Sequence, residues 1–255
     1  MDESISKSSL LRNPGRQDSS TVPAIWQQIP VPMVSRFLAQ MGWDWLILDG
    51  QHGCFNYECI HTIRIAGVSS LVRITIGNSS EVERVLDLGA LGVIVPMVNS
   101  EAEAGRLAKA AKYPPIGSRS LGGDVRLHYG EDYPERANSE TLLLIQIEHI
   151  RAVQAAEAIL SIPGVDGCFV GPTDLAISMG LSRFSYEQEL SYRQAIQHTV
   201  TVCRNLGKLA CCNSYSVADF RDKKALGFQF ISLKTDVDLF MTAAKGLLHE
   251  LRSSS

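Results

Sequence analysis

Ionisable side chains stand at or near the ends of several apolar runs in this sequence. The stretch "WLILDGQHG" passes from four apolar residues to Asp49 and His52, and "LLLIQIE" ends in Glu148. Arg73 lies inside the apolar run "LVRIT", and Asp174 closes "GCFVGPTD". If these runs are strands whose ends meet, the site would hold two carboxylates from neighbouring strands, a guanidinium and an imidazole.

Such a set of side chains suits chemistry that forms an enolate. Two carboxylates that leave coordination positions open favour a hard divalent ion such as Mg²⁺ or Mn²⁺. Arg73 offers paired donors to a substrate carboxylate or a developing oxyanion, and His52 can carry a proton near neutral pH. Gln146 adds an amide to the same region. Metal and arginine would stabilise the negative oxygen while a base moves the proton.

Each of these residues also has a structural interpretation. Arg73 could be a partner in a structural ion pair, and Glu148 with Asp174 could be ordinary polar strand ends. Asp49 with Gly50 could form a bare turn. For single residues these alternatives stay open, and the prediction of a site rests on the combination.

The apolar runs alternate with longer helical patterns. Eight such pairs begin with "PAIWQQ" and a helix from Pro32 to Met41, and end with "FQFISL" and an amphipathic stretch from Val237 to Leu251. This alternation predicts a (β/α)8 barrel, in which reactive residues gather at the C-terminal ends of the strands. The alternative is an open doubly wound sheet, which usually shows a glycine-rich phosphate turn after the first strand. No such turn is present here.

Two local expectations can be checked against the structure. Ser79 or Ser80 is expected to cap the helix of "SSEVERVLDLGA", and Gly89 to end it. The segment from Tyr113 to about Ser139 is rich in Gly, Pro and charge, and is expected to be irregular and either functional or interfacial.

The composition is that of an ordinary enzyme. The chain has 255 residues and a formal net charge of −3, with no basic excess for nucleic acid and no apolar run long enough to cross a membrane. Its six cysteines form no C-x-x-C pair, so we expect reduced, mostly buried thiols in a cytoplasmic protein. Residues 1–20 lack the apolar core of a secretory signal and are expected to be a flexible tail, with residues 21–255 forming one barrel domain.

Several segments carry a resemblance to a known family: "DWLILDGQHG", "LVRI", "VLDLGALGVIVPMVNSEAEA", "AKYPPIGSRSLGG", "LIQIE" and "GVDGCFVGPTDLAISMG". In order and content they resemble the HpcH/HpaI aldolase family, which includes 4-hydroxy-2-oxoheptanedioate aldolase and 2-dehydro-3-deoxyglucarate aldolase. The resemblance runs from about Trp26 to Leu239. It implies a (β/α)8 barrel of the phosphoenolpyruvate/pyruvate type and a homo-oligomer, a hexamer or trimer, whose last helix is exchanged between subunits.

The resemblance also implies roles for individual residues. Glu148 and Asp174 would bind a divalent metal, with Mg²⁺ expected before Mn²⁺ or Co²⁺. Arg73 would bind the carbonyl or enolate oxygen of pyruvate, and Gln146 would lie in the same site. The backbone amides of Thr173 and Asp174 would receive the pyruvate carboxylate.

Four further roles follow from the same resemblance. His52 would be the acid/base group for the aldol hydroxyl, acting through water, and Asp87 would orient it from a neighbouring element. Asp49 would support the water shell of the metal, and Trp26 would line the mouth of the barrel.

The sequence departs from the family pattern at two positions. Gln51 stands where the family usually has Glu, which makes the site less negative by one unit and removes a possible base. Ser120 stands where relatives often have Gly, in a segment that commonly serves the subunit interface and the mouth. The first change bears on proton handling or metal affinity, and the second on substrate scope.

The function implied is a divalent-metal-dependent carbon–carbon lyase. It would cleave or form 4-hydroxy-2-oxo acids through a pyruvate enolate, with a small 2-oxo acid as substrate. An alternative is an oxaloacetate decarboxylase or an enzyme that adds the enolate to an acceptor, as in the related macrophomate synthase. A third is a non-catalytic barrel retained for binding or assembly.

Overall fold

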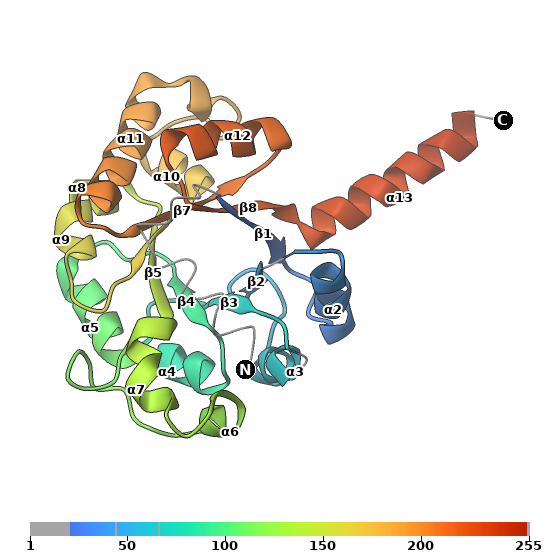
Figure 1. Cartoon of the computed structure of the whole chain (residues 1–255). Helices are drawn as coiled ribbons and strands as arrows, with labels where there is room; N and C mark the ends of the chain where they lie inside the picture. Colours follow the sequence, from blue (N-terminus) through green and yellow to red (C-terminus); the bar gives the residue numbers. More distant parts are fainter. Residues whose placement is uncertain (1–20, 44, 66, 254–255) are drawn as a thin grey trace.

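Eight parallel strands close into a barrel in chain order, and helices surround it (Figure 1). The computed structural model describes residues 21–253 except positions 44 and 66, so the expected tail at residues 1–20 lies outside the described residues. The closed order β1-β2-β3-β4-β5-β6-β7-β8 confirms the (β/α)8 prediction and excludes the open doubly wound sheet.

The strands are short, as is usual in such barrels. They are β1 (Val22–Gln27), β2 (Trp45–Asp49), β3 (Ser70–Arg73), β4 (Gly92–Val95), β5 (Leu142–Ile147), β6 (Gly167–Val170), β7 (Leu209–Ser214) and β8 (Phe230–Thr235).

The helices lie between and after the strands. They are α2 (Pro32–Gln40), α3 (Tyr57–Ile65), α4 (Ser79–Asp87), α5 (Glu101–Ala111), α6 (Val125–Tyr129), α7 (Tyr133–Glu140), α8 (Ile150–Gln154), α9 (Ala156–Leu160), α10 (Pro172–Ser178), the 3₁₀ helix η1 (Tyr186–Gln188), α11 (Leu190–Asn205), α12 (Val217–Leu226) and α13 (Asp236–Ser253).

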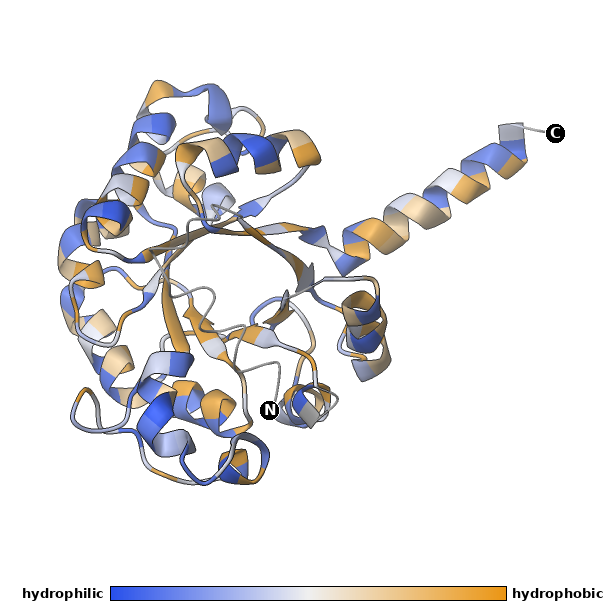
Figure 2. Cartoon of the chain, in the orientation of Figure 1, coloured by the Kyte–Doolittle hydropathy of each residue, from blue (hydrophilic) through white to orange (hydrophobic). Residues whose placement is uncertain are grey.

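Buried apolar side chains form two clusters, one inside the barrel and one between strands and helices. Figure 2 shows the strands as mainly hydrophobic, with polar residues on the outer faces of the helices. Trp45 and Ile47 belong to the inner cluster, whereas Leu46 and Leu48 belong to the outer one. Because side chains alternate between the two faces of a strand, Asp49 continues the inward face.

The same alternation brings further polar residues into the barrel. Leu71 is an inward residue of β3, so Arg73 follows it inward, and Asp49 is its register partner on β2. Leu142 and Leu144 are inward residues of β5, so Gln146 and Glu148 follow them. All these side chains therefore meet at the C-terminal end of the barrel.

Two local predictions need correction. The helix α4 is capped by Asn78 rather than by Ser79 or Ser80, because its side chain accepts a hydrogen bond from the amide of Ser80. Gly89 follows the end of this helix with φ of 89°, as predicted. The segment from Tyr113 to Ser139 is not irregular throughout, since it contains α6 and most of α7.

Tertiary contacts explain these two short helices. Tyr129 and Tyr133 stack with their ring centroids 5.3 Å apart. Arg136 forms ion pairs with Asp132 and Glu140, one turn away on either side. A five-residue helix such as α6 is too short to show a hydrophobic period, so packing decides its structure.

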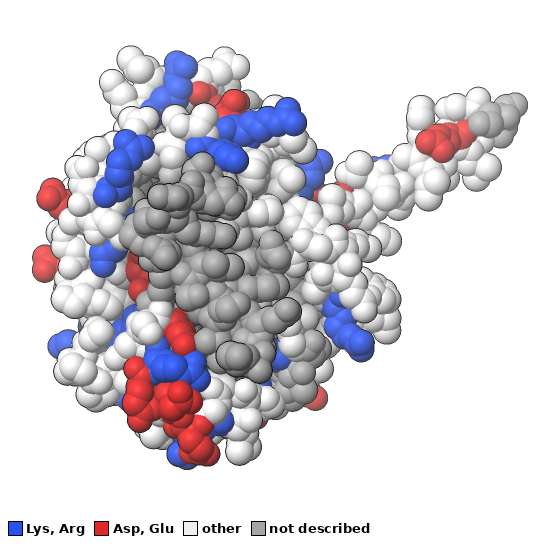
Figure 3. Space-filling view, viewed as in Figure 1, with Lys and Arg blue, Asp and Glu red and all other residues white. Residues whose placement is uncertain are grey.

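The surface carries mixed charge, and most of the cysteines are buried. Figure 3 shows charges of both signs interspersed on one face, with acidic side chains gathered over α7. Within the described residues, no helix has the length and apolar character needed to span a membrane. The six cysteines are free, and Cys168, Cys203, Cys211 and Cys212 are buried, which confirms the prediction of mostly buried thiols.

Candidate active site

Asp49 and Arg73 form a buried ion pair at neighbouring positions of β2 and β3. The Asp49 carboxylate accepts hydrogen bonds from Arg73 Nε at 3.0 Å and Nη2 at 2.7 Å, and from Trp26 Nε1 at 3.0 Å. The Arg73 guanidinium also lies 4.6 Å from the centroid of the Trp26 ring. Burial tends to raise the pKa of Asp49, but the hydrogen bonds and charge of Arg73 outweigh it and hold this pKa below its ordinary value.

The ion pair leaves Arg73 with a donor to spare. Its bonds to Asp49 use Nε and Nη2, and Nη1 makes no hydrogen bond to the described residues. Two parallel bonds fix the orientation of the guanidinium. Arg73 is therefore a partner in a structural ion pair, as one interpretation of the sequence proposed. Its Nη1 can still bind a ligand oxygen.

The Asp-Gly-Gln-His segment is a turn built on the same carboxylate. Asp49 Oδ1 accepts the backbone amides of Gln51 and His52, each at 3.1 Å. A Cβ at Gly50 would lie 2.7 Å from the carbonyl oxygen of Arg73, so the turn needs glycine there. The His52 side chain is exposed just beyond the turn. Asp49 thus forms the turn and holds Arg73 at once.

Glu148 is the second buried carboxylate at this end of the barrel. Its Oε1 accepts the amide of Met97 at 2.8 Å, and its Oε2 accepts Gln146 Nε2 at 2.5 Å. Met97 adopts φ of 57°, a left-handed conformation uncommon for a residue with a side chain. A Cβ at Gly171 would lie 2.6 Å from Glu148 Oε2, so glycine makes room for the carboxylate.

Burial makes Glu148 a weaker acid than an exposed glutamate. It raises the pKa of Glu148 from its ordinary value of 4.5 to about 7, with a smaller contribution from the negative charge of Asp174. The Met97 amide and the positive charge of Arg73 act in the opposite direction. Arg73 ends β3, Glu148 follows β5 and Asp174 follows β6, so all three lie at the C-terminal end of the barrel, where their charges influence one another.

Thr173 and Asp174 lie in the first turn of α10, directly after β6. Asp174 is exposed, and Thr173 Oγ1 lies 3.1 Å from the hydroxyl of Tyr215. The amides at the second and third positions of a helix have no acceptor within that helix. They therefore present donors at the same end of the barrel as Glu148.

The donor set at this end fits a hard divalent cation. Besides Asp49, which is bonded to Arg73, it contains the carboxylates of Glu148 and Asp174. Gln146 Oε1 is buried without a hydrogen-bond partner among the described residues. A buried amide oxygen left unpaired costs free energy, which a donor from a ligand or a water bound to an ion would recover. Oxygen ligands are those that Mg²⁺ and Mn²⁺ prefer.

Asp87 and His52 are not joined by a hydrogen bond among the described residues. Asp87 instead accepts Arg119 Nη2 at 2.7 Å, and Arg119 is buried. Arg119 comes from the segment between α5 and α6, and no sequence motif predicts its pairing with Asp87. The orientation of His52 by Asp87 therefore stays a prediction, as does the contact of Asp49 with a metal's water shell.

Sequence reasoning missed two residues that build this site. Met97 follows β4 in the apolar run "GVIVPMV", and nothing in its side chain signals that its amide binds Glu148. Gly171 stood within the motif "GPTD", where a glycine before a helix could have suggested a close approach.

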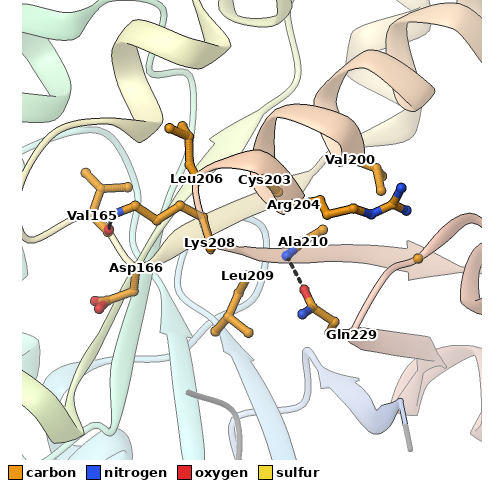
Figure 4. Close-up of a pocket in the computed structure, with 12 residues that line it drawn as sticks. Val165, Asp166, Val200, Cys203, Arg204, Leu206, Lys208, Leu209, Ala210 and Gln229 are labelled. Carbon is orange, nitrogen blue, oxygen red and sulfur yellow. Dashed lines mark hydrogen bonds between the residues drawn. The ribbon is translucent and has the colours of Figure 1, made fainter. Parts of the chain in front are cut away.

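A separate cavity of about 530 Å³ lies at the other end of the barrel (Figure 4). Asp166, Lys208 and Gln229, which line it, precede β6, β7 and β8. None of the predicted site residues lines this cavity. It borders the N-terminal ends of strands, where residues in such barrels serve stability rather than catalysis.

The raised pKa of Glu148 predicts that the free energy of unfolding depends on pH. Between pH 4.5 and 7 the folded protein retains a proton that the unfolded chain has lost, so the folded state loses stability as pH rises through this window. In the presence of a chelator, urea unfolding at pH 5, 6.5 and 8 should show wild type losing up to about 3 kcal/mol relative to Glu148→Gln. A difference that does not change with pH would contradict the raised pKa.

Comparison with known proteins places the chain in a family. The sequence model of the HpcH/HpaI aldolase/citrate lyase family matches residues 24–243. A hydroxypyruvate/pyruvate aldolase of Rhizorhabdus wittichii is 33% identical over 89% of this chain and 93% of its own. A 2-keto-3-deoxy-L-rhamnonate aldolase of Klebsiella pneumoniae is 32% identical over 96% of both. The structure of macrophomate synthase, which is 23% identical, has a TM-score of 0.84 over 100% of this chain and 89% of its own, and shows the shared fold. The chain belongs to the HpcH/HpaI aldolase/citrate lyase family.

Proposed function

We propose that this lyase of the aldolase type depends on a divalent metal and cleaves or forms 4-hydroxy-2-oxo acids through a pyruvate enolate. The observation that carries the proposal is the fixed guanidinium of Arg73, with Nη1 not bonded to the described residues, at the same end of the barrel as the buried Glu148. The two aldolase relatives, both more than 30% identical over most of the chain, support this reaction class.

Glu148 and Asp174 would hold the metal, with Mg²⁺ expected first and Mn²⁺ or Co²⁺ as alternatives. When bound, the ion supplies a Lewis acid that stabilises the negative oxygen of the enolate. Gln146 orients Glu148 through the hydrogen bond to Oε2, and its amide oxygen, which no described residue bonds, can accept from a donor. The proton that Glu148 retains below about pH 7 would have to leave before it binds the ion.

The substrate's 2-oxo acid end fits the donors at the mouth of the barrel. The amides of Thr173 and Asp174 at the start of α10 would receive the carboxylate. Arg73 Nη1 would bind the 2-oxo oxygen, and Asp49 keeps the guanidinium in place through two hydrogen bonds. Trp26 covers the guanidinium on one face, which limits the access of water to it.

In the cleavage direction the proton and electrons move in a defined order. His52, through a water, takes the proton of the 4-hydroxyl group, and the electron pair of that O–H bond forms the aldehyde carbonyl. The C3–C4 bond breaks, and its electron pair becomes the enolate of pyruvate. Arg73 stabilises the enolate oxygen until C3 takes a proton from water and gives pyruvate, and His52 releases the proton it accepted to the solvent. Gln51 makes the surroundings of His52 less negative than the family's glutamate would.

Metal-dependent pyruvate release tests this proposal. After chelation, the enzyme should release pyruvate from 4-hydroxy-2-oxo acids only when Mg²⁺, Mn²⁺ or Co²⁺ is added. Arg73→Ala should lower turnover about 10³-fold because it removes a donor to the developing oxyanion. Arg73→Lys keeps a positive charge beside Asp49. It therefore tests whether the turnover lost in Arg73→Ala is caused by misfolding alone. Arg84→Ala, exposed on α4, is the matched control.

The outcomes of this assay separate the competing functions. Full activity of Arg73→Ala would remove the mechanism. No pyruvate from any 2-oxo acid, together with no binding of a divalent ion, would favour the non-catalytic barrel.

A second candidate function is decarboxylation of oxaloacetate, or addition of the resulting enolate to an acceptor. The observation that favours it is the His52 side chain, which is exposed and makes no hydrogen bond to the described residues. Loss of carbon dioxide from oxaloacetate generates the same enolate but needs no base for a hydroxyl proton. The chemistry would then use Arg73 and the metal and rely less on His52.

Replacing His52 distinguishes these two candidates. In His52→Ala, cleavage of 4-hydroxy-2-oxo acids should fall by about 10²-fold or more, whereas release of pyruvate from oxaloacetate should persist. The two rates are measured on the same enzyme preparation with the same ion. Equal losses of both rates would show that His52 serves a step that the two reactions share, and would contradict its role toward the hydroxyl.

The last helix supports the proposal of a homo-oligomer, a hexamer or trimer in which α13 is exchanged between subunits. The helix α13 has 18 residues and extends away from the barrel (Figure 1). Asp236 is its one buried residue among those described, while Phe240, Leu247 and Leu251 are 65–68% exposed. An apolar stripe of this kind favours burial against another chain.

Charge on this stripe should disrupt the assembly. The double variant Leu247→Arg/Leu251→Arg should elute at a smaller mass than wild type in size-exclusion chromatography with light scattering. Thr242→Arg, on the same helix and also exposed, is the control for added charge. If wild type is a monomer, or if the double variant assembles as wild type does, α13 is not the exchanged element.

A further inference from the structure

Two histidines and an aspartate form a cluster between α3 and α6, away from the strand ends that carry the candidate active site. His61 Nε2 lies 3.0 Å from Asp124 Oδ2, and His128 Nε2 lies 3.2 Å from the same oxygen. The three ligand atoms all lie within 4.8 Å of one another. About a third of each side chain is exposed to solvent (33%, 36% and 34% for His61, Asp124 and His128).

Two of the three separations among these atoms match those of ligands around one ion. With metal–ligand distances near 2.05 Å, two ligands of a tetrahedral zinc ion lie about 3.3 Å apart. The two nitrogen–oxygen separations, 3.0 and 3.2 Å, are close to this value. Small side-chain rotations would therefore place one ion within bonding distance of all three.

The sequence builds this cluster from two elements. Asp124 stands just before α6, and His128 follows four residues later, so their side chains lie on the same side of the helix. His61 comes from the middle of α3, and Arg64, one turn further along, donates Nη2 to Asp124 Oδ2 at 3.2 Å. The Arg64 side chain is buried, so it contacts the Asp124 carboxylate from the protein interior.

The aspartate is prepared to act as an anionic ligand. Burial acts to raise the pKa of Asp124, but the hydrogen bond of His61 and the charge of Arg64 outweigh it and keep this pKa below its ordinary value. The neighbouring Arg64 remains a repulsive charge toward any cation. Its hydrogen bond is to Oδ2, the oxygen that also lies close to His61 and His128, so a bound ion would share this oxygen with Arg64.

We propose that His61, Asp124 and His128 bind a transition-metal ion of borderline softness, such as Zn²⁺, Co²⁺ or Ni²⁺. Two imidazole nitrogens and one carboxylate favour these ions over Mg²⁺, which prefers oxygen ligands throughout. Partial exposure allows water to complete the coordination. The site is distinct in position and in ligand chemistry from the carboxylates Glu148 and Asp174.

Occupation of this site would join two parts of the barrel's surface. His61 belongs to α3, and Asp124 with His128 belongs to the connection between α5 and β5. The same connection carries Arg119, which holds Asp87. An ion bound only by the folded protein stabilises it by mass action, and here it would stabilise the position of this connection.

Cobalt binding to the full-length, chelator-stripped protein tests the proposal. Wild type should bind a Co²⁺ ion that gives visible d–d absorption and that a hundredfold excess of Mg²⁺ does not displace. His61→Gln/His128→Gln should lose this ion, with an affinity at least 10²-fold lower, and the single variant His128→Gln should fall between. His198→Gln, an exposed histidine of α11, is the matched control and should bind as wild type does.

Two further measurements keep the histidine site apart from the proposed catalytic metal. Glu148→Gln should retain the Mg²⁺-resistant Co²⁺, and the double histidine variant should keep Mg²⁺-supported pyruvate release within about twofold of wild type. Zn²⁺ should raise the Tm of wild type and not that of the double variant. If Mg²⁺ displaces all bound Co²⁺, or the double variant binds as many Mg²⁺-resistant ions as wild type, the three side chains are only a hydrogen-bonded cluster and the proposal fails.

Discussion

The buried ion pair between Asp49 and Arg73 is the interaction on which the candidate active site depends. A guanidinium inside a barrel is costly unless a carboxylate accepts its hydrogen bonds, and Asp49 does so with both oxygens. The same carboxylate receives Trp26 and the amides of the following turn. Loss of Asp49 would therefore free the cation, the aromatic ring and the turn together. One side chain thus couples the end of β2 to the end of β3.

A second set of contacts surrounds Glu148, whose pKa is shifted in the opposite direction from that of Asp49. Glu148 accepts one amide and one side-chain donor, yet burial raises its pKa to about 7, whereas Asp49 is held ionised by its cation. Two carboxylates at one end of the barrel thereby differ in proton affinity. The difference suits a site in which one acid positions a fixed charge and the other is neutralised by a proton or by a metal ion.

Much of the fold could be predicted from sequence because strand and helix periods differ. The alternation of inward and outward residues also carried Asp49, Arg73, Gln146 and Glu148 to the same end of the barrel. The register that pairs Asp49 with Arg73 could not be read from either strand alone. It depends on how neighbouring strands are staggered, which is a property of the closed barrel.

Other features of the structure could not be predicted from the sequence. The cap of α4 was assigned to serines, although Asn78 makes the bond, since several residues in a row were chemically suitable. The helices α6 and α7 depend on stacked tyrosines and on ion pairs rather than on periodicity. Asp87 has Arg119 as its partner, and their separation along the chain gives no sign of it.

The left-handed backbone of Met97 has a consequence for how this enzyme family can vary. The residue serves Glu148 through its amide, while its side chain is 46% exposed. The constraint at position 97 therefore falls on the main chain, and glycine or asparagine would satisfy it at lower conformational cost than a β-branched residue. Within that constraint, the side chain at position 97 can change without altering the hydrogen bond to Glu148. Substitutions at position 97 could therefore change the exposed side chain at this end of the barrel while the backbone hydrogen bond to the buried carboxylate of Glu148 stays the same.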